Sequence, residues 1–127
     1  PSDARAHWCA AVACEALGDT SAARAHWEAA AEETHHHPGK ELAIYRALGL
    51  QKLGRTEEAE ALLSEARDTA LQVADTAPED AGAQFSLGLT LKAMGLDGDG
   101  EEALRRALEL APAMTRVKRL MGSDVIL

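Results

Sequence analysis

The sequence predicts an all-α protein, and three observations support this prediction. First, the 127 residues include 27 alanines but only six valines and isoleucines together; alanine is the best helix former, whereas β-branched residues favour strands. Second, glycines and prolines divide the chain into segments of helical length. Third, apolar residues recur every three or four positions within these segments, as on the buried face of a helix.

Seven helices joined by short loops are expected. They are predicted at about residues 3–17, 20–34, 41–53, 56–76, 80–94, 100–110 and 115–121. Asp19 or Thr20 is expected to cap the second helix. Asp99, followed three positions later by Glu102, has the pattern of a capping box and predicts that the sixth helix starts at Gly100.

A helix pair is the repeating unit of the chain. Gly18, Gly54 and Gly95 each end the first helix of a pair, at intervals of 36 and 41 residues. We therefore expect these glycines to adopt the left-handed conformation that commonly ends helices. A second recurrence, Ala-Arg-Ala-His-Trp at residues 4–8 and 23–27, equates two unlike helices, and we interpret it as a coincidence in an alanine-rich chain.

The pair pattern resembles the tetratricopeptide repeat, a helix–turn–helix unit of about 34 residues. The third pair carries Leu87, Gly88, Leu91, Gly95, Ala107 and Pro112 at the spacing of that family; the second carries Ala47, Leu50, Gly54, Ala59 and Ala66; the first carries Ala11, Gly18, Ala23, Trp27 and Ala30. His35 stands where the family has proline, Gly100 replaces a small alanine, and the helix that ends near Thr76 is about two turns too long.

The resemblance implies an α–α superhelix of three tetratricopeptide-like helix pairs plus a C-terminal capping helix. These would form a single domain over residues 1–127, with pairs at about 3–36, 38–76 and 78–111 and the capping helix at about 114–122. The layout also resembles the helical C-terminal tail of large bacterial proteins that have a β-rich, carbohydrate-related domain upstream. The first residues, Pro1-Ser2-Asp3, lack a methionine, so we expect a piece of a longer chain.

Composition and charge disfavour several classes of binding partner. The net charge of −8 disfavours nucleic acid and anionic membranes, which require basic surfaces. No apolar run approaches the ~20 residues that span a bilayer, and no signal peptide is visible. Cys9 and Cys14 are too far apart on a helix to form a disulfide. We therefore expect a cytoplasmic protein without membrane partners.

No catalytic constellation or cofactor motif is present. The sequence has no nucleophile elbow and no glycine-rich phosphate loop, so no enzyme activity is expected. The run His35–His37 with Glu32 and Glu33 is the one plausible metal cluster. Three consecutive residues point in different directions, however, whereas a structural zinc site needs four converging ligands. We therefore expect no specific metal site there.

The remaining candidate for a functional site is a binding surface. In the tetratricopeptide arrangement, the second, fifth, ninth and twelfth positions of each first helix face a concave groove. The resemblance assigns Arg5, Trp8, Val12 and Glu15 to this groove from the first pair, Glu41, Ile44, Leu48 and Gln51 from the second, and Gly82, Phe85, Leu89 and Lys92 from the third. Two rows are apolar, one formed by Trp8, Ile44 and Phe85 and the other by Val12, Leu48 and Leu89.

Two interpretations of these rows stay open. In the first, they line an open groove that holds a protein or peptide partner, and the chain is a non-catalytic interaction or scaffolding module. In the second, they are ordinary core, and the chain is a structural tail that packs on or dimerises an upstream enzyme domain and has no free ligand. An exposed apolar patch of this size would mark an interface.

Overall fold

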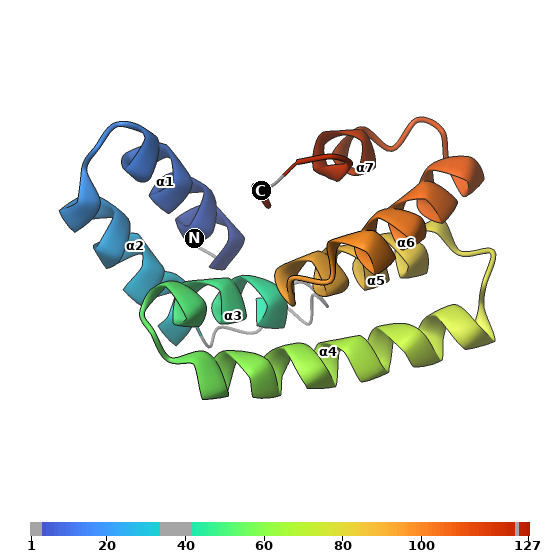
Figure 1. Ribbon diagram of the computed structural model, residues 1–127, viewed down its shortest axis with the longest axis horizontal. Coiled ribbons are helices and arrows are strands. Elements are labelled where there is room, and N and C mark those ends of the chain that lie inside the picture. Colours follow the sequence, from blue (N-terminus) through green and yellow to red (C-terminus); the bar gives the residue numbers. More distant parts are fainter. Residues whose placement is uncertain (1–3, 34–41, 124) are drawn as a thin grey trace. The chain divides into compact units, whose positions relative to one another are not determined.

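The fold is entirely helical over the residues that the computed structural model describes, 4–33, 42–123 and 125–127 (Figure 1). The helices are α1 (Ala4–Ala16), α2 (Thr20–Glu32), α3 (Leu42–Lys52), α4 (Thr56–Thr76), α5 (Ala81–Ala93), α6 (Asp97–Leu110) and α7 (Thr115–Leu120). The all-α prediction is confirmed, and each predicted helix has a counterpart.

The chain divides into two compact units, and the boundary falls inside α4. The first unit comprises the residues up to Leu62 together with Leu127, and the second comprises residues 63–126. In the first unit α1, α2 and α3 pack on one another, and in the second α5 packs on α6 and α6 on α7. The sequence predicts one domain of three helix pairs, of which the middle pair is the longest, whereas α4 contributes residues to both units.

The three marker glycines end their helices as predicted. Gly18, Gly54 and Gly95 have φ values of +78°, +79° and +81°. At each site the residue after the glycine donates its amide to a carbonyl five positions back, as from Asp19 to Cys14 at 2.9 Å. The glycine amide itself bonds three positions back, as from Gly18 to Glu15 at 3.0 Å. This is the Schellman pattern, which satisfies the last carbonyls of a helix.

Small residues let α1 and α2 approach closely. Asp19 caps α2, because its carboxylate accepts the amide of Ala22 at 3.0 Å. Two alanines on each helix have no exposed surface, namely Ala4, Ala11, Ala23 and Ala30. The next helix also approaches through a small residue, since a Cβ on Gly49 of α3 would lie 2.8 Å from the carbonyl oxygen of Trp27.

In the second unit α5 and α6 meet at two glycines. A Cβ on Gly88 would lie 2.8 Å from Leu104 Cδ2 and 3.0 Å from the carbonyl oxygen of Gly100. A Cβ on Gly100 would lie 2.8 Å from Lys92 Cγ and 3.1 Å from the carbonyl oxygen of Gly88. Gly100 departs from the tetratricopeptide pattern because the α5 backbone and the stem of Lys92 fill the space that an alanine methyl would take.

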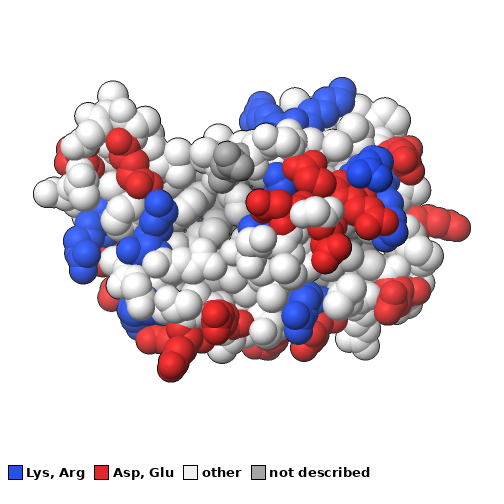
Figure 2. Space-filling model, in the orientation of Figure 1, with Lys and Arg blue, Asp and Glu red and all other residues white. Residues whose placement is uncertain are grey.

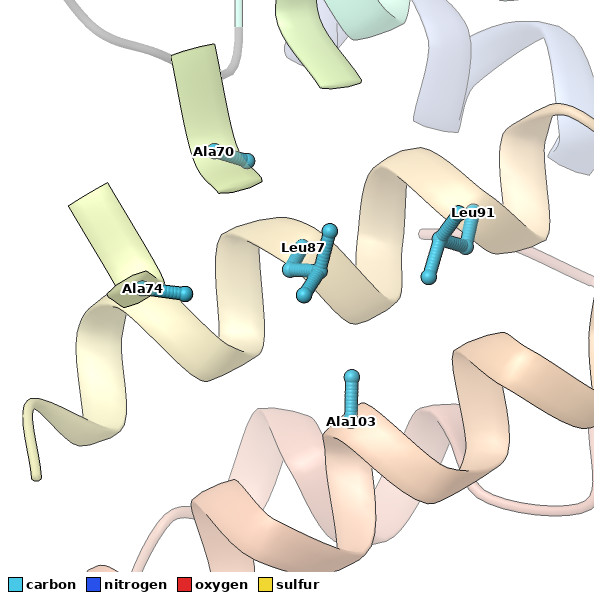
Figure 3. Close-up of a cluster of buried hydrophobic side chains, with 5 residues drawn as sticks. All are labelled: Ala70, Ala74, Leu87, Leu91 and Ala103. Atoms are coloured by element: carbon cyan, nitrogen blue, oxygen red, sulfur yellow. The ribbon is translucent and has the colours of Figure 1, made fainter. Parts of the chain in front are cut away.

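The extra turns of α4 have a packing role. The second half of the helix carries buried alanines that join a cluster with leucines of α5 and an alanine of α6. Its members are Ala70, Ala74, Leu87, Leu91 and Ala103. Figure 3 shows the two leucines on α5 between the alanines of α4 and that of α6. A helix of ordinary repeat length would end before Ala74 and lose part of this contact.

The predicted start of the sixth helix is wrong. Helix α6 begins at Asp97, and its N-cap residue is Leu96, which makes no side-chain capping bond. The turn that follows Gly95 is so short that the helix starts at once. Asp99 therefore lies in the first turn with Asp97, where both carboxylates favour the positive end of the helix dipole. The capping box at Asp99 and Glu102 does not form.

Gly54→Val should destabilise the first unit. A β-branched side chain at positive φ is strained, and we expect a loss of about 1 kcal/mol or more in the free energy of unfolding. Urea denaturation followed by circular dichroism measures this loss. Gly54→Asn is the matched control, since asparagine tolerates the left-handed region better; equal stability of the valine variant and the unsubstituted chain would contradict the prediction.

Gly100→Ala and Gly98→Ala should change stability in opposite directions, although both glycines lie in α6. Nothing lies within 4 Å of a Cβ on Gly98, so alanine should gain about 0.5 kcal/mol from helix propensity. At Gly100 the same methyl meets Lys92 and the α5 backbone, and overpacking should cost about 1–3 kcal/mol. Thermal denaturation of the two variants tests the difference, and stabilisation by both would refute the proposed close packing at Gly100.

Candidate interaction surface

The predicted groove positions of α1 differ in exposure. Trp8 is buried, with 6% of its surface exposed, whereas Arg5 and Val12 are half-buried. Glu15 is exposed at the end of the helix and pairs with Lys52 of α3, with 3.3 Å between Oε2 and Nζ. The Lys52 ammonium also lies 5.4 Å from the centre of the Trp27 ring, a cation–π arrangement. The end of α1 is thereby tied to α3 and α2 within the first unit.

The predicted groove positions of α3 include both buried and exposed residues. Ile44 and Leu48 are 1% and 5% exposed, and Gln51 is exposed. Glu41 lies outside the described residues. Arg46, between the two apolar positions, donates from Nε to the carbonyl oxygen of Ala31 at 3.3 Å, which anchors α3 to the end of α2.

The apolar groove positions of α5 are buried, and α7 of the same unit lies against Phe85. Phe85 and Leu89 are 4% and 0% exposed. The guanidinium carbon of Arg116, on α7, lies 4.8 Å from the centre of the Phe85 ring. Val117 and Leu120, one turn apart on α7, are also buried. Gly82, at the start of α5, is exposed.

Lys92 is the best-defined polar site in the second unit. The tetratricopeptide resemblance assigns it to the groove, but its side chain is only 4% exposed. Its ammonium donates to the carbonyl oxygens of Leu120 and Ser123 at 2.7 and 2.9 Å. It also lies 2.7 Å from Oε1 of Glu101 on α6. The three ammonium donors thus have three acceptors, which offsets much of the cost of burying the charge.

Glu101 completes this site from α6. Its Oε1 accepts the backbone amide of Gly122 at 2.6 Å, and Gly122 has a φ of +73°. The hydrogen bond from Lys92, followed by the Gly122 amide and the nearby positive charges, holds the pKa of this carboxyl below its ordinary value of 4.5 despite partial burial. Lys92, Glu101 and the backbone of residues 120–123, here called the Lys92 lock, fix the segment after α7 to α5 and α6.

Sequence reasoning missed most of the Lys92 lock. Nothing in the local sequence indicates that Glu101 contacts Lys92 or that Gly122 adopts a positive φ. One signal was available: Lys92 is the only charged residue in the α5 segment Ala81–Ala93. A single lysine on an otherwise buried helix indicates a bound acceptor, but the sequence does not show which carbonyls supply it.

The described part of the chain contains no metal-ligand cluster and no membrane-spanning helix. Among those residues there is no group of three or more histidine, cysteine or acidic side chains that could hold a metal ion. The run His35–His37 lies outside the described residues. None of the described helices is both long and apolar enough to cross a bilayer.

Charges of both signs are interspersed on the surface. On the face shown in Figure 2, basic side chains lie in small groups between acidic ones, without an extended basic patch. The exposed ion pairs are local, such as Arg24 with Glu28 and Arg106 with Glu102, each one helical turn apart. Such pairs contribute little to stability, and a mixed surface gives no strong electrostatic preference for a partner.

Comparison with known proteins gives no match: no family model, no curated protein and no solved structure is similar to this chain. The tetratricopeptide resemblance therefore depends on the residues quoted above.

Glu101→Gln should destabilise the second unit and flatten its acid dependence. The folded-state pKa of Glu101 is lowered, so its contribution is present above the unfolded-state pKa and is lost as the pH falls through the folded-state value. The substitution removes a hydrogen-bonded charge beside a buried ammonium and should cost about 2 kcal/mol near pH 7.

Urea denaturation at pH 7 and in steps below pH 4.5 measures both effects. The stability difference between the original chain and Glu101→Gln should shrink as the pH falls. Glu102→Gln is the matched control, because its exposed pair with Arg106 contributes little. A difference that is independent of pH would show that Glu101 acts through packing alone.

Proposed function

We propose that the chain is a non-catalytic protein-interaction or scaffolding module of the tetratricopeptide type, whose apolar concave positions hold a short helical or apolar segment. The observation that carries this proposal is the contact of α7 with α5. A short helix with apolar residues one turn apart, Val117 and Leu120, is buried in the unit where Phe85 and Leu89 occupy the predicted groove positions.

The chemistry of this contact indicates what a partner would need. Arg116 covers the Phe85 ring, and the carbonyls at the end of α7 accept from Lys92. A suitable partner is therefore an amphipathic segment with apolar residues at helical spacing and free backbone carbonyls at its end. The polar groove positions expected from the sequence, Arg5, Glu15, Glu41, Gln51 and Lys92, are of mixed sign, so apolar burial rather than charge should supply the affinity.

A structural tail is the second candidate, and the burial of Trp8 favours it. A tryptophan with 6% of its surface exposed offers little area to a free partner. In this alternative the predicted groove positions are core, and the outer surface packs on an upstream domain of the parent chain or on a second copy.

Trp8→Ala separates the two candidates. If Trp8 is a binding residue, the variant should keep its helical circular dichroism and bind a partner segment more weakly, as expected for an aromatic hot spot. If Trp8 is core, its truncation should cost about 3–5 kcal/mol of unfolding free energy. Trp8→Phe serves as the control that preserves most of the apolar volume.

The probe for binding is a labelled synthetic peptide with the sequence of residues 113–127, titrated by fluorescence anisotropy. The interaction module predicts saturable binding by the original chain, in which the peptide replaces the chain's own α7 against α5, with an affinity that changes little with salt. Absence of binding, together with a large stability loss in Trp8→Ala, would contradict the module and support the structural tail.

A further inference from the structure

The recurring Ala-Arg-Ala-His-Trp segments bring two histidines together. Helices α1 and α2 form a hairpin through the turn at Gly18 (Figure 1). Residues 4–8 and 23–27 lie one on each helix, and His7 and His26 meet across the pair with 3.1 Å between their Nδ1 atoms. The recurrence, which looks like a coincidence in the sequence alone, thus places two imidazoles next to each other.

The two rings are fixed in place yet open to solvent. Their centroids lie 5.4 Å apart with 36° between the ring planes, and both residues are half-buried. The fully buried alanines Ala4 and Ala11 flank His7 along α1, and Ala23 and Ala30 flank His26 along α2. Because the two histidines lie on helices that pack on each other, their Nδ1 atoms lie close together before any ligand binds.

The distance between the two nitrogens suits a metal ion as well as a hydrogen bond. With Zn–N bonds of 2.0–2.1 Å, two corners of a tetrahedral site lie about 3.3–3.4 Å apart. To bind the ion, the pair must open by about 0.2–0.3 Å, and both rings must turn so that the two lone pairs converge on the ion instead of pointing at each other. In the hydrogen-bonded pair one imidazole carries its proton on Nδ1; when that proton is carried on Nε2 instead, both Nδ1 lone pairs are free and no net proton is released.

We propose that His7 and His26 form a bis-imidazole site for a divalent transition-metal ion, with water in the remaining coordination positions. Imidazole nitrogens favour Cu²⁺, Ni²⁺ and Zn²⁺, whereas Mg²⁺ and Ca²⁺ require oxygen ligands. The net charge of −8 raises the local concentration of cations. The site is independent of the proposed interaction function, because neither histidine is among the groove positions.

The test requires removal of the competing ligands of this chain. In the background variant Cys9→Ser, Cys14→Ser, His35→Ala, His36→Ala and His37→Ala, calorimetric titration should show one equivalent of Zn²⁺ bound. Cu²⁺ should bind more tightly than Ni²⁺ or Zn²⁺, and Mg²⁺ should not bind. His7→Gln or His26→Gln in this background should weaken binding at least about tenfold. Arg24→Gln, an exposed substitution on α2, should leave the affinity unchanged.

A second measurement does not depend on the folding of these variants. In the unsubstituted chain, imidazole nitrogen NMR signals assigned to His7 and His26 should shift together on addition of Zn²⁺. The proposal is overturned if the background variant binds no Zn²⁺, if binding survives either glutamine substitution, or if only the signals of His35, His36 and His37 respond.

Discussion

Close approach of paired helices through residues with little or no side chain is the constraint on which this structure depends. In the first unit α1 and α2 pack on each other and carry fully buried alanines, and Gly49 lets α3 approach the backbone of Trp27. In the second unit Gly88 and Gly100 face each other. At such distances the helices gain dispersion contacts along their backbones.

The close contact at Gly100 also positions the segment that follows α7. Because Gly100 has no side chain, the stem of Lys92 runs past α6, and its ammonium reaches Glu101 and the carbonyls after α7. A buried ammonium without acceptors would cost several kcal/mol. The end of α7 and the segment after it therefore supply the carbonyl acceptors that the buried ammonium of Lys92 needs. The same hydrogen bonds hold α7 in place, because this helix is too short to be stable alone.

Local sequence signals predicted the helices well, and long-range packing explains what they missed. The Schellman turn at Gly54 and the cap at Asp19 depend on a few neighbouring residues, so both could be predicted. The start of α6 could not, because Asp99 has the right spacing for a cap, but the tight turn after Gly95 places it inside the helix. The role of the extra turns of α4 depends on Ala74 meeting α5, a contact between segments distant in sequence.

The candidate site was predictable only as a list of positions. The tetratricopeptide resemblance assigned Phe85 and Leu89 to the groove, and the structure gives both as buried residues. Lys92 was assigned to the groove by its position in the repeat, but oxygens of Glu101, Leu120 and Ser123 hold it in the interior. The pairing of His7 with His26 depends on the register of the α1–α2 hairpin, which composition and spacing do not specify.

Native-state hydrogen exchange tests the central claim that the close packing of α5 and α6 fixes α7 through the Lys92 lock. The amide of Met121 bonds to the carbonyl of Val117 at 3.0 Å, and it should exchange with the same opening free energy as the amides of α5, because α7 and α5 would open as one cooperative unit. Rapid exchange of the Met121 amide, while the amides of α5 stay protected, would show that α7 opens independently and would contradict the claim.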